Sequence, residues 1–201
     1  TACPYAGICP SEAFDVTPVV HAVTEYLIAL VGSYNLPRKY KIAFSGCGAD
    51  CACSRVNDLG FVAKTRDGKP GFAVYAGGGM GAYSRVGDLM EEWIPVKDAI
   101  RMAEAVRRLF DRTGDRGNRN RARLRFVLDK MGPEAFRQAL REEVSRVTAE
   151  AVPDCERAVE MVESPASAVP PDETICCNGN GLRSVTQRQK EKVAVLVPLP
   201  L

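Results

Sequence analysis

The chain has 201 residues, 46% hydrophobic and 26% charged, which is enough apolar material for one globular domain or one domain with a fragment of another. Its 27 basic and 25 acidic residues leave a formal charge of +2, which argues against nucleic acid or an anionic membrane as the main partner. The longest early apolar stretch is interrupted by His21, Thr24 and Glu25 and follows no basic segment, so we expect no signal peptide, no membrane span and a cytoplasmic location.

The first predicted element is a helix that follows Asp15 or Thr17 as a cap and has Pro18 in its first turn. Gly32 and Pro37 end it. Three strands are predicted next, in "KYKIAFSG" (39–46), "LGFVAKT" (59–65) and "FAVYAGGG" (72–79). The short polar turn "RDGKPG" between the last two indicates an antiparallel pair.

Amphipathic periodicity predicts four further helices, over residues 83–94, 96–114, 119–132 and 132–147. From residue 148 the sequence becomes rich in Pro, Ala, Ser and acidic residues, which is typical of a linker. A last apolar strand begins near the C-terminus, with no partner expected in the visible chain. We therefore divide the sequence into an α/β lobe (1–147), a linker (148–180) and the start of another module (181–201), and interpret the chain as a piece of a longer protein.

Eight cysteines without secretory features favour metal or redox chemistry over a disulfide framework. Cys3 and Cys9 have C-x5-C spacing, Cys47 and Cys51 have C-x3-C spacing, and Cys53 is a spare. Two such pairs brought together by the fold would supply the four thiolates of an iron–sulfur cluster. Structural zinc and simple burial of small apolar side chains are the alternatives that the spacing leaves open.

Lys39 and Lys41 are two residues apart on a predicted strand, so their ammonium groups project from the same face. Arg38 can reach from the opposite side or from the strand end. Such a pair can clamp one small anion; the alternative is a solvated edge strand that its lysines protect from aggregation.

The segment "GGGMG" contains Gly77, Gly78, Gly79 and Gly81, whose backbone N–H groups are open to close approach by a ligand. No G-x-G-x-x-G pattern is present, so nucleotide binding is weakly supported. A tight turn after the strand explains the same residues.

Five arginines lie between residues 116 and 125, at the start of a predicted helix. The positive end of that helix adds to their mutual repulsion unless an anion compensates. A polycarboxylate would bind them well, because guanidinium groups match carboxylates bidentately. The alternative is a solvated basic face.

Seven stretches in order, "CPYAG", "FDVTP", "LPRKYKIAFSGC", "NDLGF", "GFAVYAGGGMG", "EEWIPVKDAIRMAEAVRRLF" and "NRNRARLRFVLDKMGPEAFR", resemble the sirohaem-containing nitrite/sulfite reductase family over residues 2–146. The resemblance implies an α/β (α+β) fold in which helices flank a mixed sheet. It also implies a duplicated enzyme, each half pairing a ferredoxin-like piece with a sirohaem-binding lobe. Residues 181–201 look like the first strand of such a ferredoxin-like module.

The resemblance implies six-electron reduction of sulfite to sulfide or of nitrite to ammonia. It implies two cofactors, sirohaem and a [4Fe-4S] cluster, a small oxyanion substrate, and an electron donor such as ferredoxin or a flavoprotein. Lys39 and Lys41 would be the catalytic residues that hold the oxyanion and donate protons. Lys41 favours sulfite, because many nitrite reductases of the family carry a neutral residue there.

Sirohaem carries eight carboxylates and needs a basic bed. The candidate cofactor-binding residues are Arg38, Gly77, Gly78, Gly79, Gly81, Asn118, Arg119, Arg121 and Arg123. The candidate metal ligands are Cys3, Cys9, Cys47 and Cys51. In the family the "LPRKxK" strand belongs to the first half and the cluster cysteines to the second, so the cluster is bound either in this lobe or beyond residue 201.

Two other functions remain consistent with the sequence. The lobe can be a non-catalytic scaffold half of such an enzyme, or a cysteine-ligated metal or electron-transfer module without sirohaem. An absorption spectrum separates them, because sirohaem has strong Soret and red bands that zinc lacks.

Overall fold

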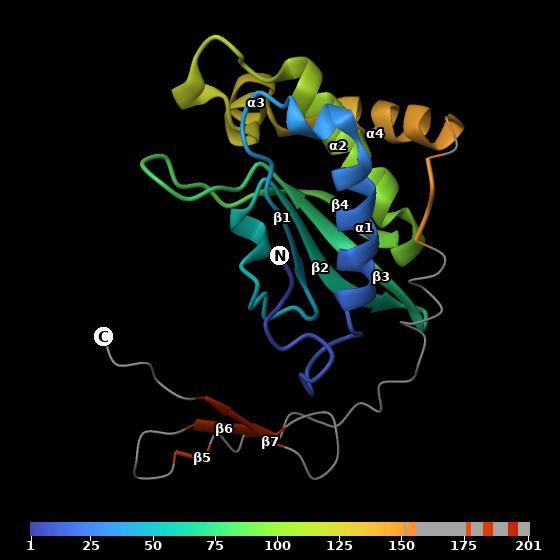
Figure 1. Cartoon of the computed structure of the whole chain (residues 1–201), viewed down its shortest axis with the longest axis vertical. Coiled ribbons are helices and arrows are strands. Elements are labelled where there is room, and N and C mark those ends of the chain that lie inside the picture. Colours follow the sequence, from blue (N-terminus) through green and yellow to red (C-terminus); the bar gives the residue numbers. More distant parts are fainter. Residues whose placement is uncertain (151, 156–175, 178–182, 187–192, 197–201) are drawn as a thin grey trace.

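A four-stranded mixed sheet with helices packed on it forms the main body of the computed structural model (Figure 1), which describes residues 1–150, 152–155, 176–177, 183–186 and 193–196. The helices are α1 (Thr17–Ala29), α2 (Ala99–Thr113), α3 (Leu124–Met131) and α4 (Pro133–Ala149), with short 3-10 turns η1 (Val31–Tyr34), η2 (Ser54–Val56), η3 (Val96–Asp98) and η4 (Arg119–Arg121). The strands are β1 (Ile42–Ser45), β2 (Leu59–Arg66), β3 (Lys69–Ala76) and β4 (Asp88–Pro95), and a separate sheet contains β5 (Cys176–Cys177), β6 (Arg183–Thr186) and β7 (Val193–Leu196). The expected α/β class, a mixed sheet flanked by helices, is confirmed.

The main sheet has the order β1-β2-β3-β4. β1 runs parallel to β2, with Ile42 opposite Leu59, and the other two pairs are antiparallel. Asp67 and Gly68 form the two-residue turn between β2 and β3, and both have positive φ angles, 52° and 74°. Two left-handed residues give the turn a twist that matches its strands, so the turn chemistry correctly predicted this hairpin.

The helix predicted over residues 83–94 is wrong, because most of this segment forms strand β4. Its two buried apolar residues, Met90 and Ile94, are four positions apart, which is a helical spacing. The same spacing suits one face of a strand, where the side chains alternate with a period of two. Phe72 lies opposite Ile94 but Val74 lies opposite Glu91, so β4 also carries an extra residue relative to β3.

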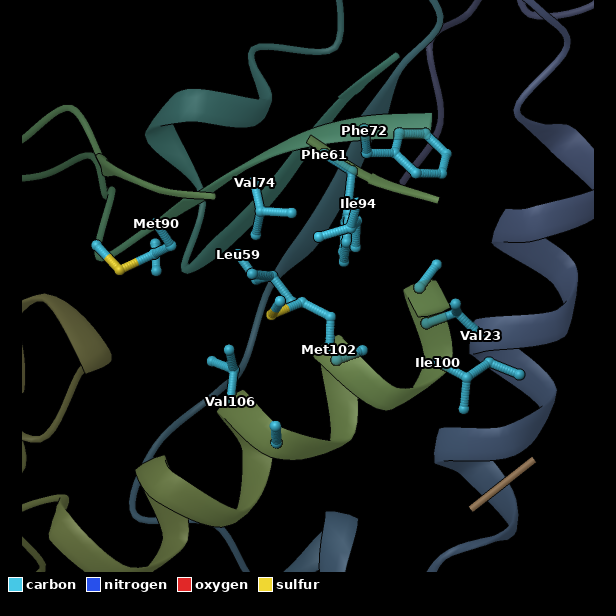
Figure 2. Packing of buried hydrophobic residues seen from close by; sticks show 14 of the residues in the cluster. Val23, Leu59, Phe61, Phe72, Val74, Met90, Ile94, Ile100, Met102 and Val106 are labelled. Carbon is cyan, nitrogen blue, oxygen red and sulfur yellow. The ribbon is translucent and has the colours of Figure 1, made fainter. Parts of the chain in front are cut away.

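The hydrophobic core lies between one face of the sheet and helices α1 and α2, which pack side by side (Figures 1 and 2). Figure 2 shows Met102 and Val106 of α2 directed toward Leu59 and Val74 of the sheet. Phe44 and Phe61 stack across the parallel pair with ring centroids 4.5 Å apart. Because this core is continuous through α2 to α4, it holds the loops at the edge of the sheet on a rigid base.

The small sheet changes one expectation. The apolar strand near the C-terminus was predicted to have no partner, but β7 pairs antiparallel with β6, which pairs with β5. The linker predicted for 148–180 lies largely outside the described residues. Val152 and Cys155, which are described, are buried against the main core. None of the described helices is both long and apolar enough to cross a membrane.

Candidate functional site: a basic cavity and a cysteine cluster

A cavity of about 750 Å³ opens where α1 and η1 approach the segment before β1, a volume typical of small-molecule sites. Its lining combines apolar and basic side chains. The lining residues are Thr1, Thr24, Leu27, Ile28, Ser33, Tyr34, Leu36, Pro37, Arg38, Lys39, Tyr40, Ile42, Arg116 and Arg119. The cavity therefore brings together two basic segments that are about 80 residues apart in the sequence. A hydrogen bond joins them: Arg116 Nη2 donates to the carbonyl oxygen of Asn35, 81 positions earlier.

The lysine segment precedes strand β1, which begins at Ile42. Tyr40 lies between the two lysines and points inward: its hydroxyl group donates a hydrogen bond to the Ala103 carbonyl oxygen at 3.1 Å. Burial, helped by the charges of Asp58 and Glu104, raises the pKa of Tyr40 well above its usual value. The side chains on either side of Tyr40, those of Lys39 and Lys41, are exposed. Of the two lysines, only Lys39 is among the residues that line the cavity.

The α-helix predicted from residue 119 begins only at Leu124, the first residue of α3. The first part of that prediction is therefore wrong. Asp115 and Asn118 explain the difference. The Asp115 carboxylate accepts the backbone N–H groups of Gly117 and Asn118, and the Asn118 side chain accepts that of Asn120. Such local side-chain bonds compete with the helical pattern, so the arginines occupy a loop and a 3-10 turn.

The arginines of this loop have different partners. Arg116 pairs with Asp111. Arg119 and Arg121 are exposed, and among the described residues no ion pair to either is found. Arg119 adds its charge to the cavity, whereas Arg121 lines a second hollow beside Tyr83 and Lys130. Of the arginine segment, Arg116 and Arg119 thus face the lysine segment.

Arg123 is held by a carboxylate that the sequence reasoning missed. Asp58, which is fully buried, accepts from Arg123 Nε at 2.9 Å and from Nη2 at 2.8 Å. Burial raises the pKa of Asp58, and the hydrogen bonds from Arg123 act against that increase. The acidic residue in "NDLGF", directly before an apolar strand, was the available signal. Arg123, a candidate for binding the cofactor, is therefore engaged by Asp58 and is not among the residues that line the basic cavity.

The glycine segment is packed against its own chain. A Cβ atom on Gly78 would lie 2.3 Å from the carbonyl oxygen of Arg55, and one on Gly79 would lie 2.6 Å from Arg125 Nη1. Gly77 has a φ of 80°. Neither these glycines nor Gly81 are among the residues lining the basic cavity. Close internal packing accounts for the buried glycines, and Gly81 lies on the exposed loop that follows.

The two cysteine pairs meet at one edge of the sheet. The backbone N–H of Cys3 donates to the Phe44 carbonyl oxygen at 2.9 Å, which places Cys3 beside β1, and Cys47 follows the end of β1. Partial desolvation raises the pKa of Cys51, and the charges of Cys3, Cys47 and Cys9 raise it further. The four thiols therefore lie within range of one another's charge, and all are free.

The loop that carries Cys51 is organised by Asp50, which has a φ of 54°. Its carboxylate accepts hydrogen bonds from the hydroxyl groups of Ser45 and Ser54 and from the Ser54 backbone. Burial raises the pKa of Asp50, but these bonds outweigh it, and the net shift is downward.

Thiols are the ligands that an iron–sulfur cluster requires. The four thiol groups do not, however, converge on one position where a metal would bind. Across the described parts of the chain, no three His, Cys, Asp or Glu side chains gather closely enough to hold a metal ion. Cys51 is exposed and Cys9 is half-buried. We therefore assign no step to a cluster at this edge.

Residues 1–148 match the family model described as the nitrite and sulphite reductase 4Fe-4S domain. The chain belongs to this family, whose members are oxidoreductases, and the resemblance read from its motifs is confirmed.

Among its relatives is the ferredoxin–nitrite reductase of Synechococcus elongatus, 34% identical over 161 residues, which cover 77% of this chain and 31% of the relative. The sulfite reductase [ferredoxin] 1 of Mycolicibacterium paratuberculosis is 31% identical over 141 residues, 70% of this chain and 25% of the relative. The solved structure of the Mycobacterium tuberculosis NirA protein has a TM-score of 0.67 and 28% identity, covering 92% of this chain and 32% of that one. The chain thus spans between a quarter and a third of the length of these proteins.

Proposed function

We propose that the full-length protein is a sirohaem-dependent reductase that reduces sulfite to sulfide, or nitrite to ammonia, with six electrons. The observation that carries the proposal is the basic cavity, where Lys39 lies with Arg38 and Arg119. The names of the relatives support an oxyanion substrate and ferredoxin as the electron donor.

The cavity suits sirohaem in charge and in apolar character. Leu27, Ile28 and Tyr34 form an apolar wall for a macrocycle, and Arg38 and Arg119 form a basic rim for its carboxylates. The exposed guanidinium of Arg121 is available for a further carboxylate. Bound sirohaem supplies the iron at which electrons reach the substrate, so the redox chemistry belongs to the cofactor.

The two lysines act on the substrate oxyanion. Their ammonium groups attract the anion, offset negative charge as electrons arrive, and donate protons to oxygen atoms that leave as water. Both side chains are exposed, so they can recover protons from solvent between steps. Lys41 in place of a neutral residue favours sulfite as the substrate.

The first test is the absorption spectrum and activity of the full-length protein, with reduced ferredoxin as donor. Soret and red sirohaem bands and turnover of sulfite above nitrite are expected. A spectrum without these bands, in protein that reduces neither anion, would refute the proposal.

The second test replaces both lysines by methionine in the full-length protein. Sulfite turnover is expected to fall much more than sirohaem content, because methionine keeps the length of the side chain and removes its charge. Lys64→Met is the matched control, since Lys64 is exposed on β2 away from the cavity. Equal loss of turnover and sirohaem would reassign the lysines to cofactor retention.

A second candidate is a non-catalytic lobe that only covers the cofactor. One observation favours it: Arg123 and the buried glycines, all expected to contact the cofactor, are engaged in internal contacts. On this alternative the double lysine variant keeps wild-type turnover.

A further inference from the structure

Asp58 contacts three of the segments that the sequence analysis singled out, although it was not a candidate itself. It lies between η2 and β2 and is fully buried. Its carboxylate reaches the lysine segment and the arginine segment, and its carbonyl oxygen reaches the glycine segment.

The carboxylate fixes Lys41. Asp58 Oδ2 accepts the backbone N–H of Lys41 at 2.8 Å, and the carbonyl oxygen of Lys41 accepts the N–H of Leu59 at 3.0 Å. Lys41 is therefore held on both backbone groups at the point where β1 starts to pair with β2. The Tyr40 side chain is anchored to α2 as well, so the lysine segment is held at two successive residues.

The same carboxylate holds Arg123 through two parallel hydrogen bonds, at 2.9 and 2.8 Å. Bidentate pairs of this kind fix direction as well as distance. The carbonyl oxygen of Asp58 also accepts the N–H of Gly77 at 2.9 Å. One residue thus sets the lysine segment, the start of α3 and the glycine segment relative to one another.

We infer that Asp58 is a positioning residue for the proposed reaction: it holds the Lys41 backbone against Arg123 and thereby fixes the segment that carries Lys41 and the cavity-lining Lys39. The inference rests on the proposed function. It also gives Arg123 a role distinct from that of Arg119: Arg123 neutralises and orients Asp58 rather than a ligand carboxylate.

Asp58→Asn is the direct test in the full-length protein. The amide has nearly the same shape, but it has only one oxygen, so it cannot accept from both Lys41 and the Arg123 fork. We expect the KM for the substrate anion, sulfite or nitrite, to rise about tenfold, while the sirohaem content stays at the wild-type level. Deuterium exchange at the Lys41 amide is expected to accelerate, and this readout does not depend on activity.

Glu143→Gln is the matched control. Glu143 is another buried carboxylate that binds two guanidinium groups, those of Arg112 at 2.9 Å and Arg146 at 3.0 Å, but it lies between α2 and α4. It is expected to lower the unfolding temperature without changing the KM. If both variants raise the KM equally, general destabilisation explains the effect and the inference is overturned.

If Asp58→Asn does not fold, Arg123→Lys takes its place, because lysine keeps the charge and loses the fork. It is expected to raise the KM and to accelerate exchange at Lys41. If the parent enzyme is active and the variant that folds has a wild-type KM, the inference about Asp58 is overturned but the proposed function is not. A parent protein without sirohaem or activity overturns the proposed function and this inference with it.

Discussion

The hydroxyl group of Tyr40 donates a hydrogen bond to the carbonyl oxygen of Ala103, across 63 positions of sequence. The bond ties the lysine segment to helix α2, and the Tyr40 ring lies 6.2 Å from that of Phe110 on the same helix. A side chain anchored between two lysines keeps both ammonium groups on the outer side. The exposed charge beside the cavity is therefore a consequence of core packing.

Tyr40→Phe is expected to lower the free energy of unfolding by about 1 kcal/mol, because it removes one partly buried hydrogen bond and keeps the ring. Urea denaturation measures the change. Tyr34→Phe is the control: its hydroxyl also donates to a backbone carbonyl, that of Ile28, but the residue is 71% exposed and water can replace the bond. Equal losses in both variants would contradict the anchoring role.

Turn chemistry was enough to predict the β2–β3 hairpin, because it depends on local rules that a sequence carries in full. The lysines of "KYK" were predicted to lie on a strand, but β1 begins only at Ile42, and of the two lysines Lys39 alone is among the residues that line the cavity. Strand β4 was mispredicted because the four-residue spacing of Met90 and Ile94 suits a helix as well as a strand. The Arg119–Arg121 turn was mispredicted because the side chains of Asp115 and Asn118 bind the backbone there. Asp58 could not be found from spacing, since its partners Lys41 and Arg123 are brought to it only by the sheet and α3.

Gly78→Ala is expected to destabilise the protein by about 1–3 kcal/mol, because the new Cβ would meet a backbone oxygen, that of Arg55, which cannot move as a side chain can. Thermal unfolding measures the cost. Gly48→Ala is the control, since nothing lies within 4 Å of its Cβ position. An unchanged Gly78→Ala protein with impaired cofactor binding would instead support a ligand-facing role for the glycine.

Glu104 is almost fully buried and binds two arginines of its own helix, Arg107 at 2.7 and 2.9 Å and Arg108 at 2.6 Å. Glu104→Gln is expected to cost roughly 3–5 kcal/mol of unfolding free energy, because it leaves a buried guanidinium without its counter-charge. Chemical denaturation at neutral pH measures it. Glu134→Gln, which breaks an exposed pair with Arg137, is expected to change little. Similar losses in the two variants would contradict the importance of burial.

Cys155 predicts a pH dependence of stability. Burial, with a smaller contribution from nearby Asp154 and Asp98, raises the pKa of this thiol to about 11. The unfolded chain ionises near its ordinary value of about 9, so it releases the proton first as the pH rises. Stability from this group is complete below about pH 9 and is lost progressively toward about pH 11.

Cys155→Ala is therefore expected to be less stable than wild type at neutral pH, because a small cavity is left, but to lose less stability on the way to about pH 11. Urea titrations at several pH values compare the two slopes. Cys53→Ala, at an exposed thiol, is expected to keep the wild-type slope. Parallel curves for Cys155→Ala and wild type would show that other groups control the alkaline transition.

The cysteine cluster gives the last prediction. In the full-length protein, the double variant Cys47→Ser, Cys51→Ser is expected to keep the iron and acid-labile sulfide of wild type. Cys51 is exposed, and in the described part of the chain no three such ligands converge on a metal ion. The family resemblance leaves the cluster either in this lobe or beyond residue 201, and this variant distinguishes the two. The measurement is iron and sulfide per chain, with Cys53→Ser as control. Loss of both in the double variant alone would assign the cluster to Cys3, Cys9, Cys47 and Cys51, because each cluster iron needs its own thiolate.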